Sequence, residues 1–385
     1  MLLLGKVCVD KEMDKVKLGD VSERGSSNLA QKDIEGLIGN YPIYGAAGYI
    51  GTVDFYHQKK DYIAVVKDGA GIGRTMFLPA KSSVLGTLQY IIPNERVVPK
   101  YLYYAVKHMN LAKYCTGATI PHIYYKDYKN EIFGLPDIPK QREVVFILEK
   151  TEKIMEGQKQ ELLDLENLIK SRFVEMFGDP VHNSMEWPIK KLSDLSLQIN
   201  SGNTPKGGEQ VYVDKGITFF RSQNVWKDRL EMDDIAYIGE ITHASMNRSS
   251  LKHGDILMTK TGRINTENSS LGRAALYLGE DDAANVNGHV YFIRLRAGVN
   301  NKFILRILVS DEYRDYIRSV CVGGIDKRQL NKDHIENFPI ICPPESMIEE
   351  YIMFVEQIDK LKVEVQKSLN ETQTLFDCLM QKYFG

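Results

Sequence analysis

A phrase that occurs twice constrains this chain of 385 residues more than any other feature. Segment 168–178 (LIKSRFVEMFG) closes one long stretch of apolar and charged residues, and segment 375–385 (LFDCLMQKYFG) closes another, 207 residues later. Solenoid repeats have periods of about 20–50 residues, so a period of half the chain indicates that a whole domain with its helix is duplicated. A protein with two copies of one binding domain is expected to bind a target that has two parts.

The duplication continues upstream as an apolar pattern with spacings of three and four residues. Over roughly five heptads, with Glu and Lys between, this pattern is typical of a coiled-coil seam. Pro139 precedes the first run and Pro343 the second, and proline is tolerated at a helix start but not inside a helix. Each helix should have roughly 35–40 residues and a length of about 55 Å, and its nearest partner is its own copy. The predicted seam positions are Val144, Leu148, Met155, Leu162, Leu165 and Ile169 in the first helix and Tyr351, Val355, Ile358, Val365, Leu369 and Phe376 in the second.

The two stretches before the helices begin and end alike but differ in between. Leu18-Gly19-Asp20 matches Leu192-Ser193-Asp194, and Cys115-Thr116-Gly117 matches Cys321-Val322-Gly323. Short runs rich in β-branched and aromatic residues predict strands at 62–66, 75–78, 89–92, 255–258 and 290–295, and 100–108 and 301–318 are predicted to be helical. We therefore expect an α+β fold with two mixed domains, at residues 1–139 and 179–344, and two long antiparallel helices, at 140–178 and 345–385, related by a pseudo-twofold axis.

Composition and charge limit the classes to which the protein can belong. No stretch approaches ~18 consecutive apolar residues, which excludes a transmembrane helix, and the first residues are too short an apolar run for a signal peptide. The five cysteines form no C-x-x-C pair, as expected for a cytoplasmic protein without a zinc site. Residues 1–139 carry 17 Lys and Arg against 14 Asp and Glu, and 179–344 carry 21 of each, whereas the helix at 345–385 carries 4 against 8. The acidic helices are expected to bind protein. The domains can bind DNA if their Lys and Arg side chains cluster on one face.

Motifs that would carry catalysis are missing. The run 69–73 (GAGIG) lacks the G-x-G-x-x-G spacing of a dinucleotide site, and a predicted strand follows it, so it is interpreted as a tight turn. The segment 43–51 is too short for a GIY-YIG nuclease. The sequence has no Walker A loop, no H-E-x-x-H and no D/N-P-P-aromatic motif of adenine methylation, and its eight histidines show no ligand spacing. These absences favour a binding subunit over an enzyme.

Taken together, these features resemble the specificity subunit of type I restriction–modification enzymes. The resemblance covers nearly the whole chain: two target-recognition domains, each followed by a spacer helix. In the second domain it lies in Leu192-Ser193-Asp194, the turn Ser201-Gly202-Asn203-Thr204-Pro205 and the strand 216–221. In the first domain it lies in 41–45 (YPIYG) and Asp68-Gly69-Ala70, and this domain lacks the Gly-x-Thr-Pro turn, so the loops of the two domains do not map one to one.

The resemblance implies a non-catalytic subunit that binds a split double-stranded DNA sequence, one half-site per domain. Its helices would dock two adenine-N6 methyltransferase subunits, nuclease–translocase (restriction) subunits would join them, and S-adenosylmethionine, ATP and Mg²⁺ would belong to these partners. Two other interpretations remain: a fused catalytic restriction or methylation enzyme, and a coiled-coil scaffold that does not bind DNA. Because Arg, Lys, Asn and Gln in loops make contacts to base edges, the candidate DNA-binding residues are Lys67, Arg74, His122, Tyr124, Tyr125 and Lys126 in the first domain, and Lys206, Arg221, Gln223, Asn224, Lys260, Arg263, Asn265, Lys327 and Arg328 in the second.

Overall fold

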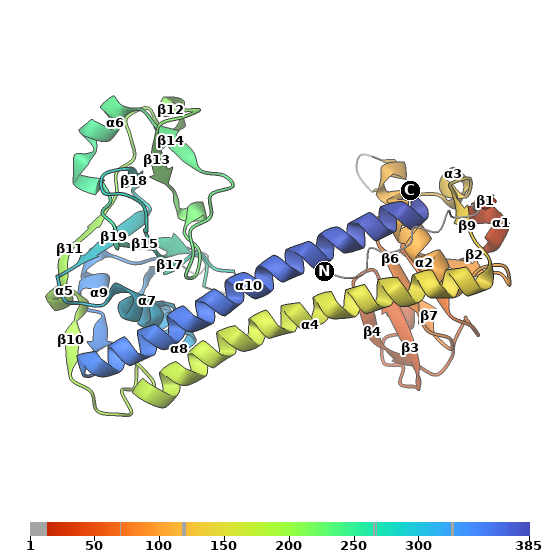
Figure 1. Ribbon diagram of the computed structural model, residues 1–385, viewed down its shortest axis with the longest axis horizontal. Coiled ribbons are helices and arrows are strands. Elements are labelled where there is room, and N and C mark those ends of the chain that lie inside the picture. Colours follow the sequence, from red (N-terminus) through yellow and green to blue (C-terminus); the bar gives the residue numbers. More distant parts are fainter. Residues whose placement is uncertain (1–13, 70, 118–120, 265, 267, 325–326) are drawn as a thin grey trace, which may run out of the picture. The chain divides into compact units, whose positions relative to one another are not determined.

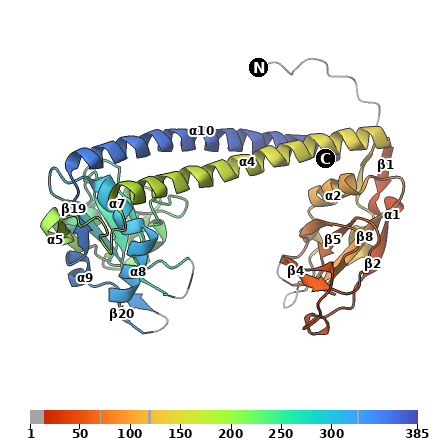
Figure 2. The same ribbon diagram turned by 90° about the horizontal axis from the view of Figure 1, so that it is seen from below.

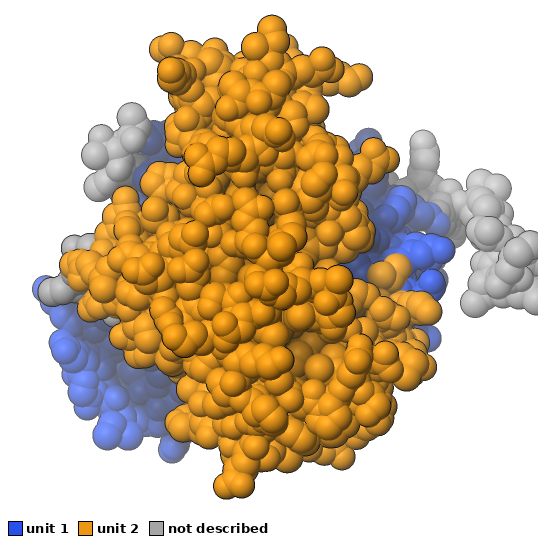
Figure 3. All heavy atoms as spheres, turned by 90° about the vertical axis from the view of Figure 1, so that its left-hand side faces the viewer, with its two compact units in different colours: residues 1–162, 364–385 blue, residues 163–363 orange. Residues whose placement is uncertain are grey.

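The computed structural model describes residues 14–69, 71–117, 121–264, 266, 268–324 and 327–385. The chain divides into two compact units, drawn blue and orange in Figure 3. Unit 1 holds the described residues up to Leu162 together with Glu364–Gly385, and unit 2 holds Leu163–Val363. Each unit combines helices with strands, which confirms the predicted α+β class with two mixed domains.

Unit 1 has its core between helix α2 and a four-stranded antiparallel sheet with the order β2-β8-β5-β6. All five residues of β5 are buried, as its run of β-branched and aromatic residues predicts. Figure 2 shows α2 beside β5 and β8. Tyr101 and Tyr104 of α2 are buried, and their rings pack near those of Phe384 and Phe376. A second sheet, β4-β3-β7, contains a parallel pair, β3 and β7. The strands are β1 (Asp14–Lys17), β2 (Ser22–Ser26), β3 (Tyr41–Gly45), β4 (Gly48–Val53), β5 (Tyr62–Val66), β6 (Thr75–Leu78), β7 (Ser83–Val84), β8 (Leu88–Pro93) and β9 (Ile132–Leu135), and the short helices are α1 (Leu18–Val21), α2 (Pro99–His108) and α3 (Tyr125–Tyr128).

Unit 2 repeats this plan with a sheet of order β11-β19-β15-β17, backed by α7, and a second sheet, β12-β14-β13-β18, in which β13 and β18 are parallel. A third, three-stranded sheet has the order β16-β21-β20. The strands are β10 (Ile189–Lys191), β11 (Ser196–Ser201), β12 (Tyr212–Val213), β13 (Ile217–Phe220), β14 (Ala236–Ile238), β15 (Ile256–Thr259), β16 (Thr261–Gly262), β17 (Ala274–Leu276), β18 (Ala284–Val286), β19 (Val290–Leu295), β20 (Val322–Gly323), β21 (Arg328–Gln329) and β22 (Pro339–Ile341); the short helices are α5 (Leu192–Leu195), α6 (Glu240–Ser245), α7 (Asn301–Val309), α8 (Asp311–Val320) and α9 (Lys332–Glu336).

Both units begin with the same local device. A two-stranded sheet, β1 with β9 in unit 1 and β10 with β22 in unit 2, leads into a one-turn helix. The Ser22 hydroxyl donates to the Leu18 carbonyl and the Ser196 hydroxyl donates to the Leu192 carbonyl, both at 2.7 Å. The sequence match at the start of each half therefore reflects one turn of identical construction.

Two long helices, α4 (Ile138–Phe177) and α10 (Glu345–Phe384), have 40 residues each (Figure 1). In unit 1, Val144 and Leu148 from the start of α4 share a core cluster with Met380 and Tyr383 from the end of α10. In unit 2, the order is the reverse, since the end of α4 meets the start of α10. The pairing is antiparallel within each unit, as predicted.

Contacts across the helix pair in unit 2 are both apolar and ionic. Lys362 donates to Glu166 at 2.7 Å, and Arg172 donates to Glu350 at 2.7 Å. Of the predicted seam positions, eight are buried, and they are Val144, Leu148, Met155, Ile169, Tyr351, Val355, Ile358 and Phe376. The other four, Leu162, Leu165, Val365 and Leu369, are half-buried.

Two sequence expectations need correction. The helix expected over 301–318 is two helices, because Ser310 ends α7 and its hydroxyl accepts the Tyr313 amide at the start of α8. Lys260 and Arg263 were expected in a loop, but a strand, β16, lies between them and pairs with β21. In the described ranges, none of the helices has the length and hydropathy needed to cross a bilayer.

Candidate nucleic-acid interface

In unit 2, three strands of two residues each bring two distant loops together. Arg328 in β21 pairs with Gly323 of β20 on one side and with Gly262 of β16 on the other. The Leu330 amide donates to the Lys260 carbonyl at 2.9 Å and extends this junction. The structure thus gathers four of the sequence-predicted residues, which are Lys260, Arg263, Lys327 and Arg328.

Unit 1 has the equivalent arrangement, made of single bridges. His122 pairs with Thr116 on one side and with Asp68 on the other, and His122 and Thr116 exchange two backbone hydrogen bonds of 2.9 Å. Thr116 precedes Gly323 by 207 residues and His122 precedes Arg328 by 206. One backbone frame therefore presents histidine in one unit and arginine in the other, and these side chains offer different donors and acceptors.

Around His122 the candidate residues form an aromatic and basic patch. The imidazole Nδ1 hydrogen-bonds the Asp68 carboxylate, and its ring centroid lies 4.1 Å from that of Tyr124. The Lys126 ammonium lies 5.2 Å from the Tyr124 ring, which is 48% exposed. An exposed ring beside a cation suits stacking on a base or contact with a phosphate. Tyr125 differs, because it packs edge-on against buried Tyr128 and belongs to the edge of the core.

The other candidates of unit 1 lie on the neighbouring turn. Lys67 is half-buried, and its amide and carbonyl are bonded to Thr87 and Ile123. Arg74 is exposed, and its guanidinium donates to the Ala46 carbonyl at 3.1 Å. Arg74 therefore joins the β3–β4 turn to the loop before β6.

A close backbone approach fixes β16. A Cβ added to Gly262 would lie 2.3 Å from the Leu271 amide nitrogen and 2.9 Å from the Ser270 hydroxyl. The Ser270 hydroxyl donates to the Thr261 carbonyl at 2.8 Å, so two strands of chain touch here without a side chain between them. Only glycine fits at position 262 without displacement of backbone.

The loop around Gly262 borders an open concavity of about 540 Å³. Its cations are Arg263 and Lys327, both exposed, and its other polar groups are amides and hydroxyls. No carboxylate lines it among the residues that the structure describes. The described lining consists of Thr261, Gly262, Arg263, Thr266, Asn268, Ser269, Ser270 and Lys327, and the predicted Asn265 lies outside the described residues.

A second group of candidates in unit 2 is bound to its own loop. Arg221 forms an ion pair with Asp234 at 3.0 Å, and Gln223 donates to the same carboxylate at 3.1 Å. Asn224 is 1% exposed; its amide donates to two backbone carbonyls, and its oxygen accepts the Arg221 amide. The expectation of an Asn224 side chain in a surface loop is therefore corrected, since its amide holds the turn together. Lys206 follows the Gly-Asn-Thr-Pro turn and is exposed.

Sequence reasoning missed an arginine-rich wall next to the Gly262 loop. Arg273, Arg314 and Arg318 line a second concavity, of about 380 Å³, which shares Asn268 and Ser269 with the first. Arg314 and Arg318 are four residues apart on α8 and therefore face the same way. That spacing was the available signal, but nothing in the sequence places Arg273, which precedes β17, beside them.

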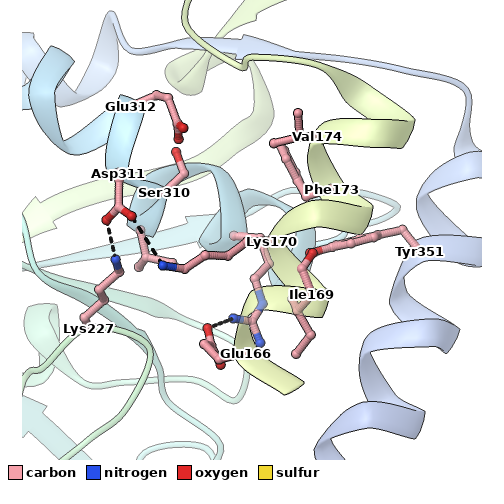
Figure 4. A pocket seen from close by; sticks show the side chains of 12 residues that line it. Glu166, Ile169, Lys170, Phe173, Val174, Lys227, Ser310, Asp311, Glu312 and Tyr351 are labelled. Atoms are coloured by element: carbon pink, nitrogen blue, oxygen red, sulfur yellow. Dashed lines mark hydrogen bonds and ion pairs between the residues drawn. The ribbon is translucent and has the colours of Figure 1, made fainter. Parts of the chain in front are cut away.

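A further pocket of unit 2 lies between the end of α4 and the start of α8 (Figure 4). Asp311 accepts hydrogen bonds from Lys227 at 2.8 Å and from Lys170 of α4 at 3.3 Å. Arg306 forms ion pairs with Asp228 at 2.7 Å and with Glu166 at 3.9 Å. These ion pairs fasten the end of α4 to its domain.

Burial and charge act in opposite directions on the two carboxylates that contact Arg306. Burial raises the pKa of Asp228, although Arg306 opposes the shift. Burial also acts to raise the pKa of Glu166, but the hydrogen bond and charge of Lys362, with the charge of Arg306, lower it below its usual value. In the described part of the chain, no group of three or more His, Cys, Asp or Glu side chains is arranged to hold a metal ion.

Comparisons with known proteins agree on one group of relatives. Residues 10–165 match the family described as "Type I restriction modification DNA specificity domain". A specificity subunit of the type I restriction enzyme MjaIX from Methanocaldococcus jannaschii is 23% identical over 318 residues, covering 76% of this chain and 69% of the relative.

Solved structures show the same fold. The S subunit of a type I restriction–modification system from M. genitalium has a TM-score of 0.58 and 14% identity, and the alignment covers 99% of this chain and 98% of that one. A chain from a study of complex assembly and conformational transition of the type I R-M system has the same score and identity, with 98% and 99% covered. At this identity, the likeness supports the architecture of two mixed domains with two long helices.

Proposed function

We propose that this chain, as a non-catalytic specificity (S) subunit of a type I restriction–modification system, recognises a split double-stranded DNA target with one half-site read by each domain. The observation that carries the proposal is the shared backbone frame with His122 at its centre in unit 1 and Arg328 in unit 2. Two frames with different side chains are suited to two different base sequences.

The proposed recognition domains are residues 1–139 and 179–344. In the second, Arg263 is the leading candidate for a base contact, because it is exposed beside a concavity without described carboxylates and arginine pairs with two acceptors of guanine. In the first, Tyr124 and Lys126 are exposed beside His122, and Arg74 is exposed on the neighbouring turn. Neither domain needs a metal or cofactor for such contacts.

The helices are proposed to dock two adenine-N6 methyltransferase subunits. Phe146 and Ile154 on α4 are 66% and 46% exposed in unit 1, and their counterparts 207 residues later, Met353 and Leu361 on α10, are 59% and 52% exposed in unit 2. Each unit thus presents one copy of the same exposed apolar pair, as two copies of one partner require. Nuclease–translocase subunits would join these, S-adenosylmethionine, ATP and Mg²⁺ would bind to the partners, and the assembly would act on DNA in the cytoplasm.

Paired substitutions in the two domains test recognition. In cells that carry the complete system, sequencing of the methylome should show that Arg263→Ala relaxes or weakens only the half-site read by 179–344, and that Arg74→Ala affects only the other half. Loss of one good bidentate base contact costs roughly 1–3 kcal/mol of discrimination. A change in both halves from either single variant would refute the assignment of one half-site to each domain.

A gel shift separates DNA binding from the alternative of a scaffold. Non-specific binding to a random duplex at low salt is expected for any protein with a DNA-binding face. Failure of the full chain, with its methyltransferase partners, to shift any duplex would favour the scaffold. Methyl transfer by the pure chain would favour the fused enzyme.

Docking is tested by the stoichiometry of the purified complex. Phe146→Asp and Met353→Asp should each remove one methyltransferase subunit, since a charge opposes burial of the apolar pair. Leu163 is a matched control, because it is also 59% exposed on α4 but its counterpart is Asn370. If Leu163→Asp disrupts assembly as strongly as Phe146→Asp, the duplicated pair is not the docking site.

A further inference from the structure

The second concavity of unit 2 has an excess of positive charge that its own carboxylates do not neutralise. Its lining includes four cations and two carboxylates, Asp311 and Asp315. Asp311 is shared by Lys170 and Lys227, and Asp315 forms an ion pair with Arg318 at 2.7 Å. Two arginines, Arg273 and Arg314, remain without an ion pair to any carboxylate of the described residues.

Arg273 is held rigidly in this wall. Its side chain is 8% exposed, its guanidinium donates to the carbonyls of Ser269 (3.0 Å) and Asn268, and it stacks on the Trp226 ring at 3.9 Å. Burial, followed by the charges of Arg314 and Arg229, lowers the pKa of Arg273. The site therefore holds a buried cation that neighbouring cations repel, and a bound anion would reduce this repulsion.

Arg314 is the cation that a ligand can use. It is half-buried on α8, and no hydrogen bond or ion pair of its guanidinium is found within the described ranges. Burial, together with the charge of Arg318, lowers the pKa of Arg314, while Asp311 and Asp315 oppose the shift. A planar guanidinium with free donors, beside a fixed second guanidinium, matches the geometry of a phosphate group.

We propose that this concavity, formed by Trp226, Arg273, Arg314 and Arg318, binds a backbone phosphate of the DNA next to the bases that the Arg263 loop reads. The proposal rests on the proposed function and deepens it. Asn268 and Ser269 line both concavities, so a duplex in contact with Arg263 would continue along the arginine wall. Phosphate contacts set the register of a protein on DNA, while base contacts specify the sequence.

The salt dependence of DNA binding distinguishes the two roles. For the complex with its methyltransferase partners, binding to target and random duplexes is measured between 50 and 200 mM salt. Arg314→Ala should lower the slope of log Kobs against log salt by about one unit. One phosphate contact makes the affinity fall by roughly 3.5-fold more over this fourfold range of salt, and the variant should lack that contribution. The affinity for target and random duplexes should fall by the same factor, and the methylated sequence should stay unchanged.

Two variants serve as controls. Arg314→Lys keeps the charge and should retain most of the slope. Arg248→Ala removes an exposed arginine of the same unit outside the concavity and should leave the slope unchanged. Thermal melts of each variant verify that α8 remains folded.

Three outcomes would overturn the proposal while leaving the proposed function standing. The first is an unchanged slope for Arg314→Ala with normal target recognition. The second is a change in the recognised sequence, which would make Arg314 a base-reading residue. The third is binding of inorganic phosphate that depends on Arg314 while the DNA slope does not, which would identify a small-anion site. If the unsubstituted complex bound no DNA at all, this result would instead refute the proposed function itself.

Discussion

The phenylalanines of the repeated phrase give a sharp test of the duplicated design. Phe177 is fully buried in unit 2, and its ring centroid lies 5.0 Å from that of Phe303 and 5.5 Å from that of Tyr351. Its counterpart Phe384 is 6% exposed in unit 1, with the Tyr101 ring at 5.0 Å. Each phenylalanine thus joins the end of a long helix to a short helix of a different domain.

The cost of truncation follows from burial. Phe→Ala substitutions in a core cost about 3–5 kcal/mol, depending on how far the cavity collapses, and aromatic pairs add about 0.5–1.5 kcal/mol. We expect about 4–5 kcal/mol for Phe177→Ala, which has no exposure and several aromatic neighbours, and about 3–4 kcal/mol for Phe384→Ala. Since a domain is stable by about 5–15 kcal/mol, each variant should leave its own unit only marginally folded.

Hydrogen exchange measured by mass spectrometry resolves the two units peptide by peptide. Phe177→Ala should raise exchange in β15, β19 and α7, and Phe384→Ala should raise it in β5, β8 and α2. Phe146→Ala, with Phe146 66% exposed on α4, should stay within about 0.5 kcal/mol of the parent. Equal loss of protection in both units from one variant, or no loss from either, would refute the equivalence of the two phenylalanines.

Three further predictions concern single positions. Lys362 and nearby cations lower the pKa of Glu166 despite its burial. The ionised Glu166 carboxylate therefore stabilises the folded state at pH values above its unfolded-state pKa of 4.5, and this stabilisation is lost as the pH falls through the lower folded-state pKa. In urea titrations, the stability deficit of Glu166→Gln, up to about 1 kcal/mol for such a partly exposed pair, should shrink as the pH falls below 4.5; a deficit that stays constant as the pH falls contradicts this. Gly262→Ala should weaken recognition of the half-site of 179–344 alone, because its Cβ meets backbone at 2.3 Å; an unchanged methylome would show that the loop tolerates the shift. Leu369→Asp places a charge in the seam at a cost of several kcal/mol and should abolish methyltransferase assembly or soluble expression, and normal assembly would remove Leu369 from the seam.

The sequence predicted the architecture because long-period duplication and heptad spacing are strong signals. The helices observed at Ile138–Phe177 and Glu345–Phe384 lie within two residues of their expected starts and one residue of their expected ends. Strands such as β5 and β19 were predictable, since they are continuous runs of β-branched and aromatic residues. Local pattern and global fold agree at these elements.

The candidate site was less predictable because its frame consists of strands with two residues each. β16, β20 and β21 are too short to show a periodicity, and they exist only because tertiary pairing closes them. Asn224 has the composition of a surface loop, yet its amide is consumed by backbone carbonyls. Arg273 and Arg314 lie 41 residues apart, and only the folded chain brings them to one wall.

The composition of unit 1 has a consequence for synthesis on the ribosome. Its core includes Phe376, Met380, Tyr383 and Phe384, which are translated long after Tyr101. At about 5–20 residues per second, the 282 residues between Tyr101 and Phe384 take roughly 15–60 s to be synthesised. The first domain therefore leaves the exit tunnel with part of its apolar core uncovered until residues 364–385 are made. Unit 2 is one continuous segment and can fold before that. Unit 2 is thus expected to finish folding before unit 1, although it is translated later. Chaperones are expected to bind the first domain during this interval.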